Sequence, residues 1–187
     1  METTIKKINI NFTLPNQDME NLTTNKTIKT KKEPKNREIT NTKLWQITEE
    51  ELQPDAQLSY IHQLVCDEIV DTNPCQVILK HITQKINGYK AQDIKKALYE
   101  QDKLVDIHYV LNTLEKAANI CYYCKNPVKV LYKTVREQTQ WSLDRIDNNI
   151  GHNKENVVIA CLQCNVGRKT MHQGRYVFTK QLVIIKS

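Results

Sequence analysis

The sequence predicts an α+β fold in three consecutive parts: a disordered basic tail over residues 1–53, a helical region over 54–118 and a small strand-containing module over 119–187. The tail is rich in Asn, Thr, Lys and Glu and offers few apolar side chains to bury. In the middle the apolar residues recur at helical spacing, whereas the end of the chain alternates with a period of two between two pairs of cysteines. A chain of 187 residues has room for one ordinary domain, or for a small catalytic module with a helical appendage.

Two series of apolar residues predict the helices of the middle region. The first series is Leu58, Ile61, Leu64, Val65 and Ile69, and the second is Val77, Ile78, Ile82 and Ile86. Asn73-Pro74 has the composition of a helix start, and Asn87-Gly88 is expected to end the same helix. A further helix is expected over 91–99, and Asp106 is placed to cap a last one. The region is therefore expected to form a small helical layer.

Histidine and cysteine residues also occur in these predicted helices. We expect His62, His81 and His108 to be core or interface groups rather than metal ligands. Cys66 and Cys75 are expected to behave as small buried hydrophobic side chains, with a redox or additional metal role left open.

Strands are expected after Asn119, where the apolar period changes. Alternation over 128–130 and again over 141–145 predicts a β-hairpin formed by these two segments. A polar loop follows over 147–156, and the apolar segment 157–160 is expected to be either a strand or the start of a helix.

Four of the six cysteines form two Cys-x-x-Cys pairs, Cys121 with Cys124 and Cys161 with Cys164. Thiolates at this spacing let two turns close a tetrahedral zinc site. Because four protein ligands fill the coordination sphere, we expect the zinc to be structural. The alternative is a coincidental set of free thiols. A module this small cannot build a large core, so bound zinc is expected to supply much of its stability.

Between and just beyond the cysteine pairs lies an ordered set of polar residues: Trp141-Ser-Leu-Asp-Arg-Ile-Asp147, Gly151-His152, Asn156 and Cys161-Leu-Gln-Cys164-Asn165. This set resembles the HNH (His-Me finger, ββα-metal) endonuclease family, in a variant that we associate with proteins of large DNA viruses and phages. The resemblance covers residues 121–169, and the stretch 88–93 also resembles what accompanies this variant. It implies two antiparallel strands and a helix in a zinc-stapled, treble-clef-like module.

The resemblance also implies roles for individual residues. Asp144 would be the carboxylate ligand of a catalytic divalent ion, and Asn165, at the final motif position, would be the second ligand. These hard oxygen ligands suit Mg²⁺ or Mn²⁺ rather than zinc. Asn156 matches the central Asn, whose amide orients the catalytic loop. Arg145 occupies the place of the first His, which is normally the general base.

The arginine at that position leaves the identity of the base open. A guanidinium stays protonated at neutral pH, so Arg145 is expected to clamp a phosphate or to stabilise developing charge. His152, with an ordinary pKa near 6.5, is one candidate for the base. The equally weighted alternative is that His152 packs in the loop and supports Asn156. A third route uses a metal-bound or phosphate-activated water and no protein base.

Four further residues have structural expectations. Asp147 can complete the metal shell or pair with Arg145 or Arg168, and we favour the pairing. Trp141 is expected to anchor the hairpin core, and Tyr122-Tyr123 to cover the zinc site.

The formal net charge of +6 indicates a polyanionic partner. The basic run over 26–37 alone is typical of a solvated charged face. The run beyond Asn165, with Arg168, Lys169 and Arg175, lies beside the cysteine module and is expected to contact DNA phosphates. We therefore expect a metal-dependent endonuclease that hydrolyses DNA. The alternative is a catalytically inactive zinc module that binds nucleic acid or a protein partner.

The sequence also bears on location. It contains no apolar run near the roughly twenty residues that a membrane span requires, and its start lacks the apolar segment of a signal peptide. We expect an intracellular protein without a membrane partner, in the host cytoplasm or nucleus, or in the virion, if it is viral. Cysteines in a reducing compartment are better explained as metal ligands or buried thiols than as disulfides. The oligomeric state is not predicted.

Overall fold

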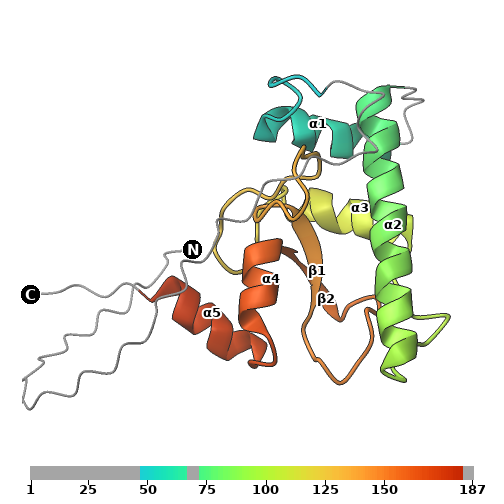
Figure 1. The fold of residues 1–187 in the computed structure, drawn as a ribbon, viewed down its shortest axis with the longest axis vertical. Coiled ribbons are helices and arrows are strands. Elements are labelled where there is room, and N and C mark those ends of the chain that lie inside the picture. The colour runs from blue at the N-terminus through green and yellow to red at the C-terminus, as the bar shows by residue number, and fades with distance from the viewer. Residues whose placement is uncertain (1–46, 67–71, 183–187) are drawn as a thin grey trace, which may run out of the picture. The chain divides into compact units, whose positions relative to one another are not determined.

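A computed structural model describes residues 47–66 and 72–182 of the chain. The helices and strands of this part are α1 (Pro54–Val65), α2 (Asn73–Lys95), α3 (Ile107–Lys116), β1 (Trp141–Arg145), β2 (Val157–Cys161), α4 (Leu162–Arg168) and α5 (Gln173–Gln181). They belong to one compact unit, in which β1 and β2 lie between α4 and α2 (Figure 1). The combination of helices with a two-stranded sheet confirms the predicted α+β class.

Parts of the predicted tail and module lie outside the described residues, namely 1–46, 67–71 and 183–187. The basic run over 26–37 and Ile69 of the first apolar series are among them. Residues 47–53, which were assigned to the tail, form turns in the structure. Ile47 is buried, and the backbone amides of Thr48 and Glu51 each donate to the other's side chain. The described end of the predicted tail is therefore folded.

The sheet does not have the predicted pairing. β1 pairs antiparallel with β2, from Trp141 opposite Cys161 to Arg145 opposite Val157. Segment 128–130 meets the chain before β1 through an isolated bridge between Lys129 and Gln140 only. Its alternation was misleading because its valines enter the core from a loop rather than from a strand. Of the two alternatives for 157–160, the strand is the correct one.

The helix α2 is longer than predicted. It starts at the predicted Asn73, but it continues through Asn87-Gly88 to Lys95, so the expected stop and the separate helix over 91–99 are both wrong. No glycine among the described residues has a positive φ. A glycine inside a helix costs about 1 kcal/mol, which is less than the burial of Ile82 and Tyr89 on either side contributes. The predicted cap of α3 is confirmed, because the Asp106 carboxylate accepts from the Tyr109 amide at 2.8 Å.

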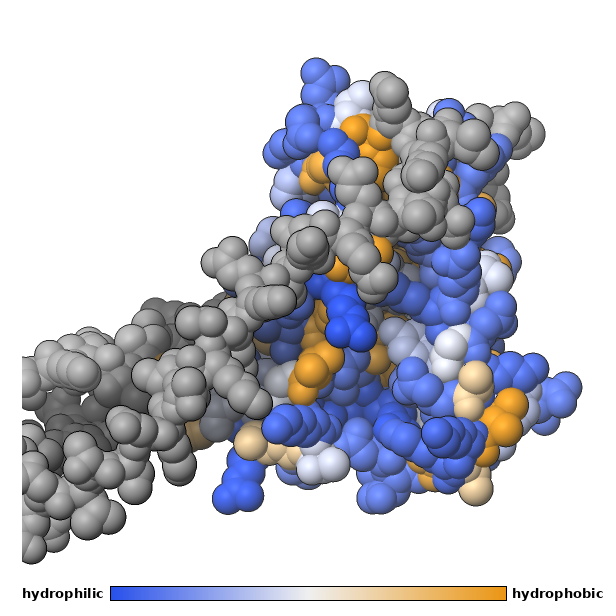
Figure 2. Space-filling model, in the orientation of Figure 1, coloured by the Kyte–Doolittle hydropathy of each residue, from blue (hydrophilic) through white to orange (hydrophobic). Residues whose placement is uncertain are grey.

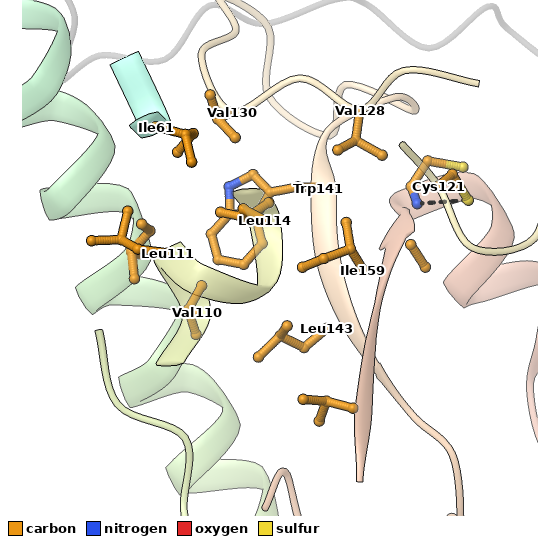
Figure 3. Close-up of a cluster of buried hydrophobic side chains, with 14 of the residues drawn as sticks. Ile61, Val110, Leu111, Leu114, Cys121, Val128, Val130, Trp141, Leu143 and Ile159 are labelled. Carbon is orange, nitrogen blue, oxygen red and sulfur yellow. Dashed lines mark hydrogen bonds between the residues drawn. The ribbon is translucent and has the colours of Figure 1, made fainter. Parts of the chain in front are cut away.

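One hydrophobic core joins the helices to the sheet (Figure 3). Trp141, which is fully buried, lies among Ile61 of α1, Leu111 and Leu114 of α3, and Ile159 of β2 (Figure 3). The prediction that Trp141 anchors a core is confirmed. The core runs across residue 118, where the helical region was predicted to give way to the module.

The histidines and cysteines of the helices differ in exposure. His81 and Cys75 are buried, as predicted. Cys66 is exposed, because it follows the last turn of α1 instead of facing the core. His108 is exposed, and His62 joins α1 to α3 through Glu115 at 2.7 Å.

The surface shown in Figure 2 is mainly hydrophilic, with small apolar patches between charged side chains. Within residues 47–66 and 72–182, no helix has the length and apolar character that crossing a bilayer requires.

Candidate metal centre and cleft

The four cysteines of the two Cys-x-x-Cys pairs come together. Cys121 and Cys124 lie in the turn after α3, Cys161 ends β2, and Cys164 lies in α4. Their sulfur atoms all lie within 4.8 Å of one another. The cluster can therefore hold a metal ion such as zinc.

Backbone hydrogen bonds fix this arrangement. The Tyr122 amide donates to the Ile159 carbonyl at 2.8 Å, which ties the first turn to β2. The Cys161 amide donates to the Cys121 sulfur at 3.3 Å. Hydrogen bonds from the Cys161 side chain and from backbone amides lower the pKa of Cys121, whereas the same contact and burial raise the pKa of Cys161. The contact therefore favours a thiolate at Cys121, and the thiolate is the form of cysteine that binds a metal.

A separate cleft of about 500 Å³ is bounded by α2, β1 and α4. It is lined by Asp144, Arg145, His152 and Asn165, four of the five residues predicted to be catalytic. A larger hollow of about 730 Å³ between α1, α2 and α3 has mainly apolar walls and is lined by none of the residues predicted to be catalytic. The residues predicted to be catalytic therefore gather mainly in the smaller cleft.

The Asp144 carboxylate is held on β1 by two neighbours. The Tyr123 hydroxyl donates to Oδ2, and the Arg168 guanidinium lies 3.3 Å from both carboxylate oxygens. Burial raises the pKa of Asp144, although Tyr123, Arg168 and Arg145 act in the opposite direction. Two carboxylate oxygens offer about four lone-pair positions, so capacity for a cation remains beside these bonds.

Arg168 is buried and does not face solvent, with 1% of its surface exposed. Its two terminal nitrogens donate to the Arg145 carbonyl at 3.0 and 2.9 Å, and one also reaches the Ile146 carbonyl at 3.2 Å. The prediction that Arg168 contacts DNA phosphates is therefore wrong, since its guanidinium joins α4 to the end of β1. Lys169 and Arg175 are exposed, and Lys169 also lines the cleft.

The amide of Asn165 is oriented by the strand beside it. Its Nδ2 donates to the Ser142 hydroxyl at 3.1 Å and to the Leu143 carbonyl at 3.0 Å. The amide nitrogen is thereby occupied, and Oδ1 is the atom left for a ligand in the cleft.

His152 is 5% exposed and is held by a residue of α2. Its Nδ1 lies 2.9 Å from Asp93 Oδ1, its backbone amide donates to Asp93 Oδ2 at 2.6 Å, and its ring stacks on Tyr89 with centroids 4.3 Å apart. Burial is the main cause that lowers the pKa of His152. Arg145 lies on the same side, 3.9 Å from Asp93 Oδ1, and donates to the Ile150 carbonyl at 3.2 Å.

Asn156 does not line the cleft but holds the loop that does. Its Nδ2 donates to the carbonyls of Asp147 and Gly151 at 3.1 and 3.0 Å, and its Oδ1 accepts from the Asp147 amide at 3.0 Å. The Asp147 carboxylate accepts from the Asn149 amide and forms no ion pair with an arginine within the described part of the chain. The favoured pairing of Asp147 is therefore wrong.

Two residues of α2 that hold or line the cleft escaped the sequence analysis. Asp93 lay in a stretch to which no chemistry was assigned, and Lys85 carries no local signal. The Lys85 ammonium donates to the Trp141 carbonyl and, at 3.0 Å, to Gln140, and burial lowers its pKa to about 7. Lys96, the residue that follows the last turn of α2, lines the cleft with Lys85. The sequence predicts a helix rich in lysine here, but it does not show which of these lysines lie on the face packed against β1.

Comparison of the chain with models of protein families, with curated proteins and with solved structures found no match. The resemblance to HNH endonucleases therefore stays a prediction that rests on the residues and their geometry.

Proposed function

We propose that the chain is a metal-dependent endonuclease of the HNH type, which hydrolyses DNA phosphodiester bonds. One observation carries this proposal: a single cleft is lined by Asp144, Arg145, His152 and Asn165, which lie up to 21 positions apart in the sequence. The order β1, β2, α4 along the chain agrees with the two strands and helix that the resemblance implies. In this proposal the four cysteines hold a structural zinc ion.

The carboxylate of Asp144 and the Oδ1 of Asn165 are proposed to bind Mg²⁺ or Mn²⁺. A bound divalent ion would neutralise the scissile phosphate and the leaving oxygen. Both ligands offer oxygen, which these ions prefer, and neither belongs to the thiolate cluster. Asp144 is held on β1 and Asn165 on α4, and groups held in place before the reaction are what efficient catalysis requires.

His152 is proposed to accept the proton of the attacking water. The water oxygen forms a bond to phosphorus, the bond from phosphorus to the leaving sugar oxygen breaks, and the proton passes to the imidazole. Because its pKa is lowered, His152 is neutral at physiological pH and free to accept that proton. Arg145 supplies positive charge for the phosphate in the transition state.

One observation favours the alternative of a binding module without catalysis. Both oxygens of Asp144 already accept hydrogen bonds, from Tyr123 and from Arg168, which is also how a purely structural carboxylate is held. In that case the lysines of the cleft would bind a DNA phosphate, and the protein would not hydrolyse the DNA.

The test is cleavage of supercoiled plasmid by zinc-loaded protein with Mg²⁺, with Mn²⁺ and with neither. Asp144→Asn keeps a hydrogen-bond acceptor for Tyr123 but removes the charge, and we expect it to lower the cleavage rate by about 100-fold or more. The matched control is Asp147→Asn, which changes an exposed carboxylate outside the cleft and should cleave like the wild type. Plasmid binding without cleavage under every metal condition would leave the binding module as the function.

A further inference from the structure

Asp93 has an unusual position for an acidic residue. It lies in α2, 59 positions before His152, and its side chain is fully buried. A buried carboxylate is costly unless its oxygens are paired and hydrogen-bonded. Asp93 meets this condition mainly through His152, because its two oxygens accept from the ring and from the backbone amide of that residue, and the Arg145 guanidinium lies 3.9 Å from Oδ1.

The contact depends on close approach of the two chain segments. A Cβ atom at Gly151 would lie 2.5 Å from the Leu98 carbonyl oxygen and 3.0 Å from Asp93 Oδ2. Only a glycine before His152 lets the loop come this near to the end of α2. The histidine is thus held on two sides, by the carboxylate at its edge and by Tyr89 against its face.

We infer that Asp93 is a positioning residue, which fixes the neutral His152 in the tautomer that carries its proton on Nδ1 and presents Nε2 as the proton acceptor in the cleft. The role as acceptor rests on the proposed function, whereas the tautomer does not.

The chemistry of the pair gives this result directly. An ionised carboxylate only accepts hydrogen bonds, so Nδ1 of His152 must donate to Asp93. A neutral imidazole has one N–H, and Nε2 is then left with a free lone pair. No described residue bonds to Nε2, and this atom is not among the buried polar atoms without a partner, so it retains access to solvent.

The charged groups around the ring maintain its neutral form. Burial, Arg145 of β1 and Lys96 at the C-terminal end of α2 lower the pKa of His152, and Asp93 opposes them. The net direction is downward, so the ring does not gain a second proton at neutral pH. Asp93 therefore orients the base and does not keep it protonated.

The test compares Asp93→Asn with Asp93→Glu in the full-length, zinc-loaded chain. The asparagine can still accept from the His152 amide, but its own amide N–H must donate to Nδ1, which moves the ring proton to Nε2. The tautomer is measured by two-bond ¹H–¹⁵N correlation on ¹⁵N-histidine protein, with His152→Gln to assign the signal. We expect the Nδ1–H form in the wild type and in Asp93→Glu, and the Nε2–H form in Asp93→Asn.

Cleavage kinetics give the second reading. We expect Asp93→Asn to lower kcat by about 100-fold or more with little change in KM, and Asp93→Glu to restore part of it. A wild-type signal in the Nε2–H form overturns the inference, and this result is decisive even if Asp93→Asn does not fold. A switch of tautomer with unchanged kcat overturns the catalytic role. A wild type that cleaves no DNA but shows the Nδ1–H form removes the proposed function and leaves the positioning intact.

Discussion

Arg168 shows how much a single side chain contributes to the cleft. It connects the last turn of α4 to the carbonyls that end β1 and to the carboxylate of Asp144. Hydrogen bonds between charged and neutral groups in a buried site contribute about 1.5–3 kcal/mol each, so this guanidinium is a structural element in its own right. The positive charge near Asp144 is therefore fixed in place before any ligand arrives.

At the residue scale, the burial of His81 leads us to expect that the protein becomes less stable as the pH falls. It is buried, its Nδ1 has no hydrogen-bond partner among the described residues, and burial lowers its pKa. The unfolded chain, with a histidine pKa of about 6.5, binds the proton first as the pH falls. The free energy of unfolding should therefore decrease below about pH 6.5, by at most about 1.4 kcal/mol per pH unit for this group.

Urea unfolding of wild type and His81→Gln at several pH values measures this effect. For each protein the free energy of unfolding is plotted against pH. The slope of this plot should differ between wild type and variant below about pH 6.5 and should be the same above it. His152 acts in the same direction, so the slope should shrink in the variant and not vanish. Equal slopes below that pH would show that His81 is not the group responsible.

At the scale of elements, replacing glycine by alanine should change the free energy of unfolding in opposite directions at two positions. A Cβ at Gly88, in the middle of α2, meets no atom within 4 Å, whereas a Cβ at Gly151 would collide with the Leu98 carbonyl. Gly88→Ala should raise the free energy of unfolding by about 1 kcal/mol, because alanine loses less backbone entropy in a helix. Gly151→Ala should lower it, and thermal unfolding of both variants provides the comparison. A destabilised Gly88→Ala would contradict this account of α2.

The thiolate cluster joins three elements, the turn after α3, the end of β2 and the start of α4. If it holds zinc as proposed, the purified protein contains one zinc ion per chain. Cys161→Ser should release it and lower the free energy of unfolding by more than about 4 kcal/mol, which is the range typical of losing a structural metal. Metal analysis and unfolding are compared with Cys66→Ser, whose exposed thiol lies outside the cluster. Unchanged zinc content in Cys161→Ser would contradict the assignment.

These elements also show which features the sequence can predict. The start of α2 and the Asp106 cap were predictable because their signals act within one helical turn. The cysteine cluster and the four cleft residues were predictable from motif spacing. The partner of β1, the continuity of α2 and the burial of Arg168 were not, since each depends on contacts between distant segments. Asp93 escaped for the same reason.

At the scale of the whole molecule, the cleft concentrates positive charge. It is lined by Lys96, Lys169 and Arg145, and by Lys85, whose charge is weakened because burial lowers its pKa to about 7. Asp144 is the acidic residue among the described lining. Lys96→Ala and Lys169→Ala should each weaken DNA binding independently of sequence and reduce the slope of log K against log salt by about 0.9. Fluorescence anisotropy over about 50–200 mM salt measures the slope. Lys116→Ala, at a different hollow, is the control, and an equal effect there would show non-specific attraction only.

The shared core limits how the molecule can be divided. A fragment cut at residue 119 would contain every cysteine of the cluster and every residue of the motif that resembles HNH endonucleases, yet it would expose the faces of Trp141 and Leu143 that the helices now cover. It would also leave behind Asp93, the partner of His152. A shortened version of the protein therefore has to include the helices, because they cover its core and supply the partner of His152.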